Sequence, residues 1–144
     1  IGCVDDPCLA TGELLPVKDT PFDFNKRKRI GQDLEADHIQ LKNAFGYDHS
    51  FVLNDTENQL TLEEPVSGRR LVISTTAPVV QVYTGNFLKD GCIGKAGRVY
   101  ENREGVALET QLMPNAINTE ENPSTILRKG DKFESNTKYV FEIM

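Results

Sequence analysis

Alternation of apolar and polar residues is the main pattern in the second half of the chain. In the segment 106–112, Glu109 and Gln111 fall on one face, and mostly apolar residues fall on the other. In the segment 79–83, Gln81 shares a face with a tyrosine, and valines take the opposite face. A period of two residues is typical of half-buried β-strands, so both segments are predicted strands.

Further strands are predicted on either side of these two. The segments 70–76 and 137–143 are rich in β-branched and apolar residues. Two shorter apolar runs, Phe51–Leu53 and Leu60–Leu62, flank the polar segment 54–58, and this arrangement predicts a β-hairpin. Many short strands separated by turn residues indicate an all-β fold, in the form of an antiparallel β-sandwich or barrel.

The remaining segments carry weaker patterns. Gln32–Asn43 is the one predicted helix, because Leu34, His38 and Leu41 recur at helical spacing without an intervening Gly or Pro. The first twenty residues contain Pro7 and Pro16, Pro21 follows directly, and there is little period, so we expect a loop without a strand. The sequence shows no linker or repeat that would divide residues 1–144. Because open sheet edges need cover, we expect the chain to be part of something larger.

The composition fits one globular domain with an acidic surface. The 144 residues include 22 acidic and 16 basic side chains, which gives a formal net charge of −6. Such a charge argues against a nucleic-acid partner, which would require a basic face. The basic run at 26–29 is interpreted as a solvated loop. No apolar run approaches the ~18 residues of a membrane span, so no membrane partner is predicted.

Cysteine and histidine are scarce. The three cysteines, Cys3, Cys8 and Cys92, favour reduced structural thiols in a cytoplasmic protein, although a Cys3–Cys8 disulfide stays open as an alternative. The two histidines, His38 and His49, add too few ligands for a zinc site. We therefore predict no metal site.

Three places in the sequence carry candidate chemistry. A carboxylate and an amide on one strand face, as at Glu109, can hold a general base against a polar ligand, although a solvated glutamate is the simpler interpretation. The amide and the aromatic ring at Gln81 and Tyr83 suit a sugar, which offers both hydroxyls and apolar C–H faces; an ordinary strand is the alternative.

The third place is the pair Asp48 and His49, which stands immediately before a predicted strand. Neighbouring residues in a strand face opposite ways, so the two act together only if the backbone is irregular there. The alternative is a turn that leads into the strand, with His49 packed or solvated. Asp48 and Glu109 also raise the hypothesis of paired carboxylates, as in glycoside hydrolysis.

Six strings of the sequence are informative in combination and span nearly all of the chain. In order they are Thr20-Pro21-Phe22-Asp23-Phe24, Gly46-Tyr47-Asp48-His49, Ser67-Gly68-Arg69, Tyr83-Thr84-Gly85-Asn86, Leu108-Glu109-Thr110-Gln111 and Pro114-Asn115-Ala116-Ile117-Asn118. Their types and order resemble the C-terminal part of the galactose mutarotase (aldose 1-epimerase) family.

This resemblance implies a fold, an activity and roles for particular residues. The fold would be part of that family's large antiparallel β-sandwich. The activity would be interconversion of the α and β anomers of an aldohexose, chiefly galactose or glucose, without a cofactor. Glu109 matches the family's catalytic base, which takes the proton from the anomeric hydroxyl. Asp48 and Gln81 match positions that contact the sugar.

The resemblance also implies that something is missing. The family's general acid is a histidine in the N-terminal half of a considerably longer chain, and neither His38 nor His49 matches it. We therefore expect the 144 residues alone to be nearly inactive, with the missing N-terminal half of the same enzyme as the partner. Two alternatives stay open: a non-catalytic carbohydrate-binding module, and a glycosidase-like enzyme that uses Asp48 and Glu109.

Overall fold

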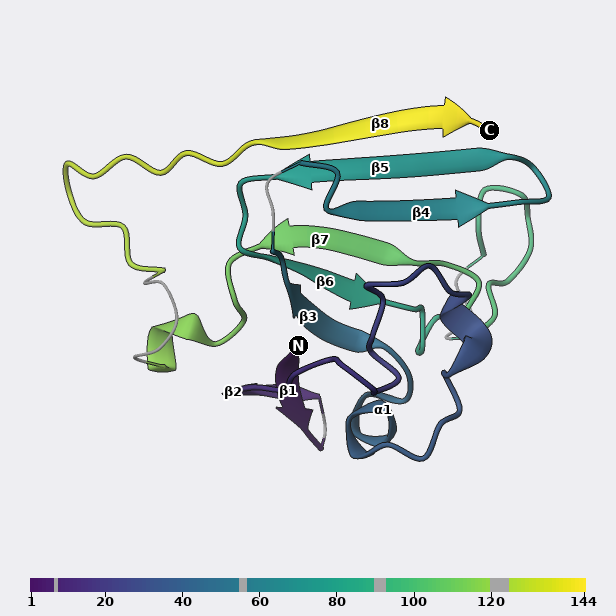
Figure 1. Ribbon diagram of the computed structural model, residues 1–144, viewed down its shortest axis with the longest axis horizontal. Helices are drawn as coiled ribbons and strands as arrows, with labels where there is room; N and C mark the ends of the chain where they lie inside the picture. The colour runs from purple at the N-terminus through teal and green to yellow at the C-terminus, as the bar shows by residue number, and fades with distance from the viewer. Residues whose placement is uncertain (7, 55–56, 90–92, 120–124) are drawn as a thin grey trace.

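In the described part of the chain, short antiparallel strands form three sheets. The computed structural model describes residues 1–6, 8–54, 57–89, 93–119 and 125–144. Figure 1 shows the sheet β3-β6-β7 beside the sheet β4-β5-β8, with the β1–β2 hairpin and α1 below β3. The elements are β1 (Gly2–Asp5), β2 (Leu9–Leu14), the 3₁₀ turn η1 (Ile30–Gln32), α1 (Ile39–Ala44), β3 (Asp48–Val52), β4 (Leu60–Glu64), β5 (Arg69–Thr75), β6 (Val79–Tyr83), β7 (Ala107–Gln111), η2 (Ala116–Asn118) and β8 (Thr137–Ile143). The predicted antiparallel all-β class with one short helix is confirmed for the described residues.

Strand β6 is the centre of the sheet that carries the candidate site. It pairs with β3 on one side and with β7 on the other, both antiparallel. Val79 and Val80 are almost fully buried, and their β-branched side chains suit the pleated surface of a central strand. The predicted strands at 79–83 and 106–112 are confirmed, the second as β7.

Strand β5 is the centre of the other three-stranded sheet. It pairs with β4 and β8, which confirms the strands predicted at 70–76 and 137–143. The predicted hairpin of 51–53 with 60–62 is wrong, because β3 and β4 lie in different sheets. The Leu53 N–H donates to the Pro78 carbonyl (3.0 Å), so the chain leaving β3 stays beside the start of β6 before it crosses to β4. The two candidate partner strands of β3, β4 and β6, are both apolar, so a local sequence pattern does not distinguish them.

The N-terminal segment corrects a second expectation. Residues predicted to loop form the β1–β2 hairpin instead. The hairpin is held by distant side chains: Gln40 accepts from the Val4 N–H (2.7 Å) and donates to the Val4 carbonyl (3.0 Å), and Asn43 donates to the same carbonyl (2.8 Å). A side-chain amide thus replaces a neighbouring strand, and a local pattern does not show such a partner.

The helix is shorter than predicted and begins later. His38 has an extended backbone (φ −134°, ψ 131°), and its side chain accepts from the Gln40 N–H, so it caps a helix that starts at Ile39. Two tight turns, closed by backbone hydrogen bonds within residues 33–38, occupy the earlier part of the predicted span. The helix ends at Phe45, which adopts the left-handed conformation. No helix in the described residues has the length and apolar character to cross a membrane.

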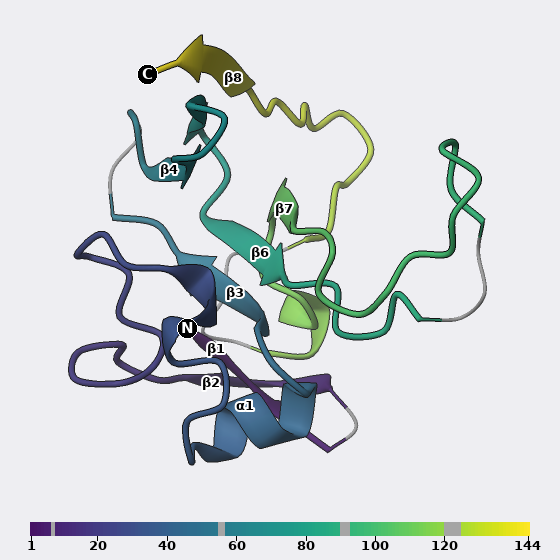
Figure 2. The same cartoon turned by 90° about the vertical axis from the view of Figure 1, so that its right-hand side faces the viewer.

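The main core lies between the N-terminal segments and the back of the β3-β6-β7 sheet. Figure 2 shows from the side how the β1–β2 hairpin and α1 lie below β3. Its fully buried members include Phe22 and Tyr47, whose rings meet edge to face with centroids 5.4 Å apart. Phe24 and Phe51 pack around them. Edge-to-face aromatic pairs of this kind fix the N-terminal segments against the sheet.

The basic run at 26–29 is more ordered than predicted. Lys28 is largely buried: its ammonium group donates to the Pro21 carbonyl (2.6 Å), pairs with Asp33 (2.8 Å) and lies 4.5 Å from the ring centroid of Phe24. Arg27 pairs with Glu63 of β4 (2.9 Å). The interpretation of this run as a solvated loop is therefore wrong at Lys28, whereas the Arg27 side chain is 76% exposed and agrees with it.

Cys3 and Cys8 are both free thiols and form no disulfide with each other. The Cys8 thiol donates to the Asn43 carbonyl (3.3 Å). Burial raises the pKa of both thiols. This state agrees with the prediction of reduced structural thiols at these two positions. Cys92 lies outside the described residues.

Candidate active site

Three neighbouring strands bring the predicted site residues together on one face. Ser50 of β3, Gln81 of β6 and Glu109 of β7 are Cα partners, so they form one row across the sheet. Asp48 lies two residues along β3 from Ser50, opposite Tyr83. Because residues two apart in a strand share a face, Asp48 and Ser50 point the same way. The structure therefore gathers Asp48, Gln81 and Glu109 on one surface.

This face is hollowed into an open pocket of about 470 Å³. The residues that line it are Asp48, Gln81, Tyr83, Phe87, Glu109, Gln111 and Pro114. Asp48, Gln81, Glu109 and Gln111 contribute polar groups to its lining, and Phe87 and Pro114 add apolar surface. A pocket with amide, carboxylate and aromatic groups matches the two kinds of surface that a sugar presents.

The Gln81 amide is held by hydrogen bonds at both of its ends. Its Nε2 donates to Oδ1 of Asp48 (2.7 Å), and its Oε1 accepts from the hydroxyl of Ser50. The first is a charge-assisted hydrogen bond, which is stronger than a neutral one. This pair of contacts fixes which end of the amide faces Asp48 and leaves one N–H of the amide for a ligand.

Glu109 differs from its neighbours because its carboxylate is unengaged. It is exposed at the pocket, and within the described part of the chain it has neither a hydrogen-bond nor an ion-pair partner. An ionised carboxylate with free lone pairs can accept a proton from a ligand hydroxyl placed within about 3 Å.

Two contributors to this face were not predicted from the sequence. Ser50 is buried beneath the pocket, and Phe87 lines its rim. The backbone N–H of Phe87 donates to the Tyr83 hydroxyl (2.9 Å), which ties the rim to β6. The signal for Ser50 was its spacing of two from Asp48, but this signal becomes specific only once β3 is known to pair with β6.

His49 lies on the opposite face of the same sheet. It is fully buried, and its ring meets that of Phe22 edge to face with centroids 4.7 Å apart. Its Nδ1 accepts from the Asp48 N–H (3.1 Å), while Nε2 has no partner among the described residues. Burial, reinforced by the positive N-terminal ammonium group, lowers the pKa of His49 to about 4. The ring is therefore neutral near pH 7.

Neither histidine lines the pocket. His38 caps α1, and its ring packs against Phe22 with centroids 5.3 Å apart. The alternation within β3 turns His49 away from Asp48, as expected for neighbours in a regular strand. A cooperative Asp48–His49 pair in the pocket is thus ruled out by the backbone.

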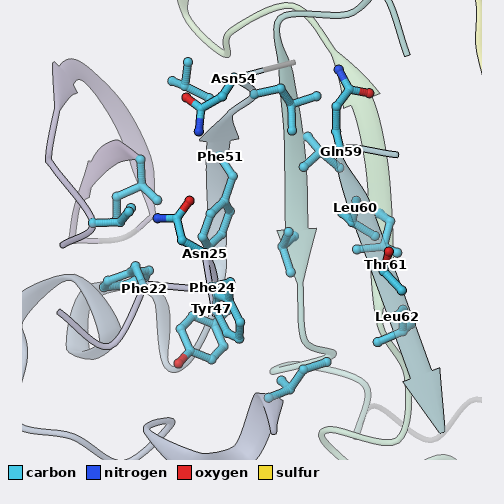
Figure 3. Close-up of a pocket in the computed structure, with 18 of the residues that line it drawn as sticks. Phe22, Phe24, Asn25, Tyr47, Phe51, Asn54, Gln59, Leu60, Thr61 and Leu62 are labelled. Carbon is cyan, nitrogen blue, oxygen red and sulfur yellow. The ribbon is translucent and has the colours of Figure 1, made fainter. Parts of the chain in front are cut away.

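A second, mainly apolar cavity of about 690 Å³ lies on the back of the sheet. Figure 3 shows side chains from β3 and β4 on its two sides, with Phe51 facing Leu60 and Leu62 across the gap. Val80 and Leu108 add apolar surface from β6 and β7. Beyond it, β8 exposes Phe141 and Ile143, with 79% and 77% of their surface accessible. Large apolar surfaces of this kind usually mark an interface.

Comparisons with known proteins match nearly the whole chain. The family model described as aldose 1-epimerase matches residues 2–140. Galactose mutarotase of Sus scrofa is 38% identical over 143 residues, which are 97% of this chain and 40% of that protein. Aldose 1-epimerase of Escherichia coli is 34% identical over 144 residues, which are 96% of this chain and 41% of that protein.

Solved structures resemble the whole of the described fold. The crystal structure of the GalM/aldose epimerase homologue from C. elegans superposes with a TM-score of 0.82 at 30% identity, covering 99% of this chain and 42% of that one. Galactose 1-epimerase from Lactobacillus acidophilus gives 0.62 at 25% identity, covering 94% and 39%. The chain thus spans about 40% of the length of the curated relatives it matches. By the family model and by these similarities, the chain belongs to the aldose 1-epimerase family.

Proposed function

We propose that this chain is the C-terminal portion of an aldose 1-epimerase and supplies the catalytic base and part of the sugar site. The observation that carries this proposal is that Asp48, Gln81 and Glu109, from three adjacent strands, share one face of the sheet and line one open pocket. The substrate would be an aldohexose such as galactose or glucose, as the names of the related proteins indicate.

Glu109 acts as the base in this proposal. Its free carboxylate takes the proton from the anomeric hydroxyl while the bond between C1 and the ring oxygen breaks, which gives the open aldehyde. Rotation about the C1–C2 bond then presents the other face of the carbonyl, and the ring closes to the opposite anomer. Asp48 and the free N–H of Gln81 hold sugar hydroxyls during this sequence, because a carboxylate accepts and an amide N–H donates.

Ring opening also needs a proton at the ring oxygen, and neither histidine of this chain reaches the pocket. We propose that the acid comes from polypeptide equivalent to the part of the relatives that this chain does not span. The apolar cavity and the exposed face of β8 support this step, because they offer a large surface on which that polypeptide can pack. A cytoplasmic location also belongs to this proposal, since Cys3 and Cys8 are free thiols.

The glycosidase-like alternative is less well supported. Strand β6 lies between the strands of Asp48 and Glu109, so two strand spacings, roughly 10 Å, separate them across the sheet. They are also two residues apart in register along the strands. Glycosidase carboxyl groups stand about 5–9.5 Å apart with the scissile bond between them. In this chain the Gln81 amide, which lies between the two carboxylates, donates a hydrogen bond to Asp48.

Polarimetry of freshly dissolved α-galactose tests the proposal. The joined protein, in which this chain is fused to the part of an aldose 1-epimerase that it does not span, should accelerate mutarotation. The 144 residues alone should be nearly inactive. Glu109→Gln should lower the rate of the joined protein by about 10²–10⁴-fold, the usual contribution of a general base. Glu13→Gln, which changes another exposed strand carboxylate, is the matched control and should keep the rate.

Three outcomes contradict the proposal. An undiminished rate with Glu109→Gln removes the base assignment. Sugar binding by the joined protein without faster mutarotation indicates a carbohydrate-binding module. Release of reducing sugar from an aryl glycoside indicates the glycosidase-like enzyme.

A further inference from the structure

Ser50 is a buried polar residue whose place in the site is not explained by contact with a ligand. Only 4% of its surface is accessible, and it is not among the residues that line the pocket. It is the Cα partner of Gln81, and its hydroxyl donates to Oε1 of that residue. Its effect on a ligand must therefore pass through Gln81.

The Gln81 amide would otherwise have two neighbours to choose between. On the β3 side, its Nε2 donates to Asp48. On the β7 side, its Cα partner is Glu109, and Cβ atoms of directly opposed residues stand about 4.5–5.5 Å apart. That separation is within reach of a glutamine side chain, so the amide could donate to either carboxylate.

The direction of the amide decides whether Glu109 is free. An amide N–H that donates to Glu109 would occupy lone pairs that must accept the anomeric proton in the proposed reaction. In the observed arrangement, the amide is engaged by Asp48 and Ser50, and Glu109 has no partner within the described residues. The contact with Ser50 adds a second fixed point, which a single bond to Asp48 does not supply.

We propose that Ser50 is a positioning residue that holds the Gln81 amide toward Asp48 and away from Glu109. The hydroxyl keeps the base free and points the remaining amide N–H into the pocket. This inference rests on the proposed function for the roles of Glu109 and Gln81 toward the sugar. The orientation of the amide can be measured without any sugar.

The first test is NMR of the ¹⁵N-labelled 144-residue chain. In the unchanged chain, the Gln81 side-chain amide protons should give nuclear Overhauser effects to Asp48 and not to the Glu109 side chain. In Ser50→Ala, exchange of these protons with solvent should accelerate about three- to tenfold, the effect of one neutral hydrogen bond. New contacts to Glu109 should also appear. Ser50→Thr keeps the hydroxyl and should retain the original contacts.

Ser74→Ala is the matched control. It removes another serine hydroxyl, one that accepts from the Asn58 N–H (2.9 Å) in the other three-stranded sheet, and should leave the Gln81 signals unchanged. Contacts from the Gln81 amide to Glu109 in the unchanged chain would overturn the proposal, and this result does not depend on how any variant folds. Unchanged Gln81 signals in a folded Ser50→Ala variant would overturn it as well.

The second test is a double-mutant cycle on galactose affinity in the joined protein. Ser50→Ala should weaken binding about three- to tenfold in the original background and should have little further effect once Gln81→Ala is present. An equal loss in both backgrounds would contradict positioning through Gln81. If Glu109→Gln has no effect on mutarotation while the NMR contacts behave as expected, the proposed function fails and the orienting role of Ser50 stands.

Discussion

The two faces of the β3-β6-β7 sheet are built from alternate residues of the same strands, and they differ in polarity and in exposure. The front face carries Asp48, Gln81 and Glu109 around an open polar pocket. The back face carries His49 and Val80, which are almost fully buried. A shift of one residue along a strand therefore separates a group that can meet a ligand from a group that only packs.

Asp48 and His49 show what this difference teaches. Both side chains are chemically able to transfer protons, and they are adjacent in the sequence. Asp48 reaches the pocket and holds Gln81, whereas His49 is sealed against Phe22 with a pKa lowered to about 4 by burial. Residue type alone thus does not identify the acid or the base, because the face of the strand decides which group reaches the ligand.

The largest expected effect is a loss of stability on truncation of a buried ring that packs against the back face. Phe22→Ala should lower the free energy of unfolding by about 3–5 kcal/mol, because it removes a fully buried ring that contacts Tyr47 and His49. Urea denaturation followed by circular dichroism measures this change. Phe133→Ala removes a ring that is 63% exposed, and its effect should stay within about 0.5 kcal/mol. Similar losses in the two variants would contradict the assignment of the core.

The next effect is the pH dependence that His49 imposes. Burial lowers its pKa from 6.5 to about 4, so between these values the unfolded chain binds a proton that the folded chain does not. Its contribution to stability should be complete above pH 6.5 and fall by about 3 kcal/mol as the pH drops to 4.

Urea denaturation between pH 4 and 7, compared with the same series for His49→Phe, isolates this contribution from that of the carboxylates. The variant keeps an aromatic ring beside Phe22 and should lose stability less steeply on acidification. Equal slopes for the two proteins would show that His49 is accessible to protons in the folded state.

The smallest of these effects should come from the front face. Asp48→Asn removes the charge that anchors Gln81 and accepts sugar hydroxyls, and should weaken galactose binding to the joined protein about 10–100-fold. Isothermal titration calorimetry measures the change. Asp37→Asn, at an exposed carboxylate that pairs with Lys42, is the control and should leave the affinity unchanged. An unaltered affinity with Asp48→Asn would remove this residue from the binding site.

Much of the second half of the fold follows from local alternation. The pattern predicts β5, β6, β7 and β8, and it places Gln81 and Glu109 on polar faces. This succeeds because each strand has one buried side and one accessible side, and these two environments leave a period of two in the sequence.

The pairing of strands and the contacts between distant residues cannot be predicted from local alternation. The sequence pattern predicts that β3 pairs with β4, whereas in the structure β3 pairs with β6. Every candidate partner strand is apolar, so the pattern does not distinguish them. The β1–β2 hairpin was missed, since Gln40 completes it from a helix 36 residues away. The role of Ser50 depends on its pairing with Gln81, so it emerges only with the tertiary structure.

The most direct test of the account is an NMR titration of the ¹⁵N-labelled joined protein with galactose. The account predicts that signals of the front-face residues Gln81, Glu109 and Gln111 move with the sugar concentration. Signals of the back-face residues His49 and Val80 should stay in place. Changes confined to the back face, or an absence of change on the front face at saturating sugar, would contradict the claim that this polar face is the sugar site.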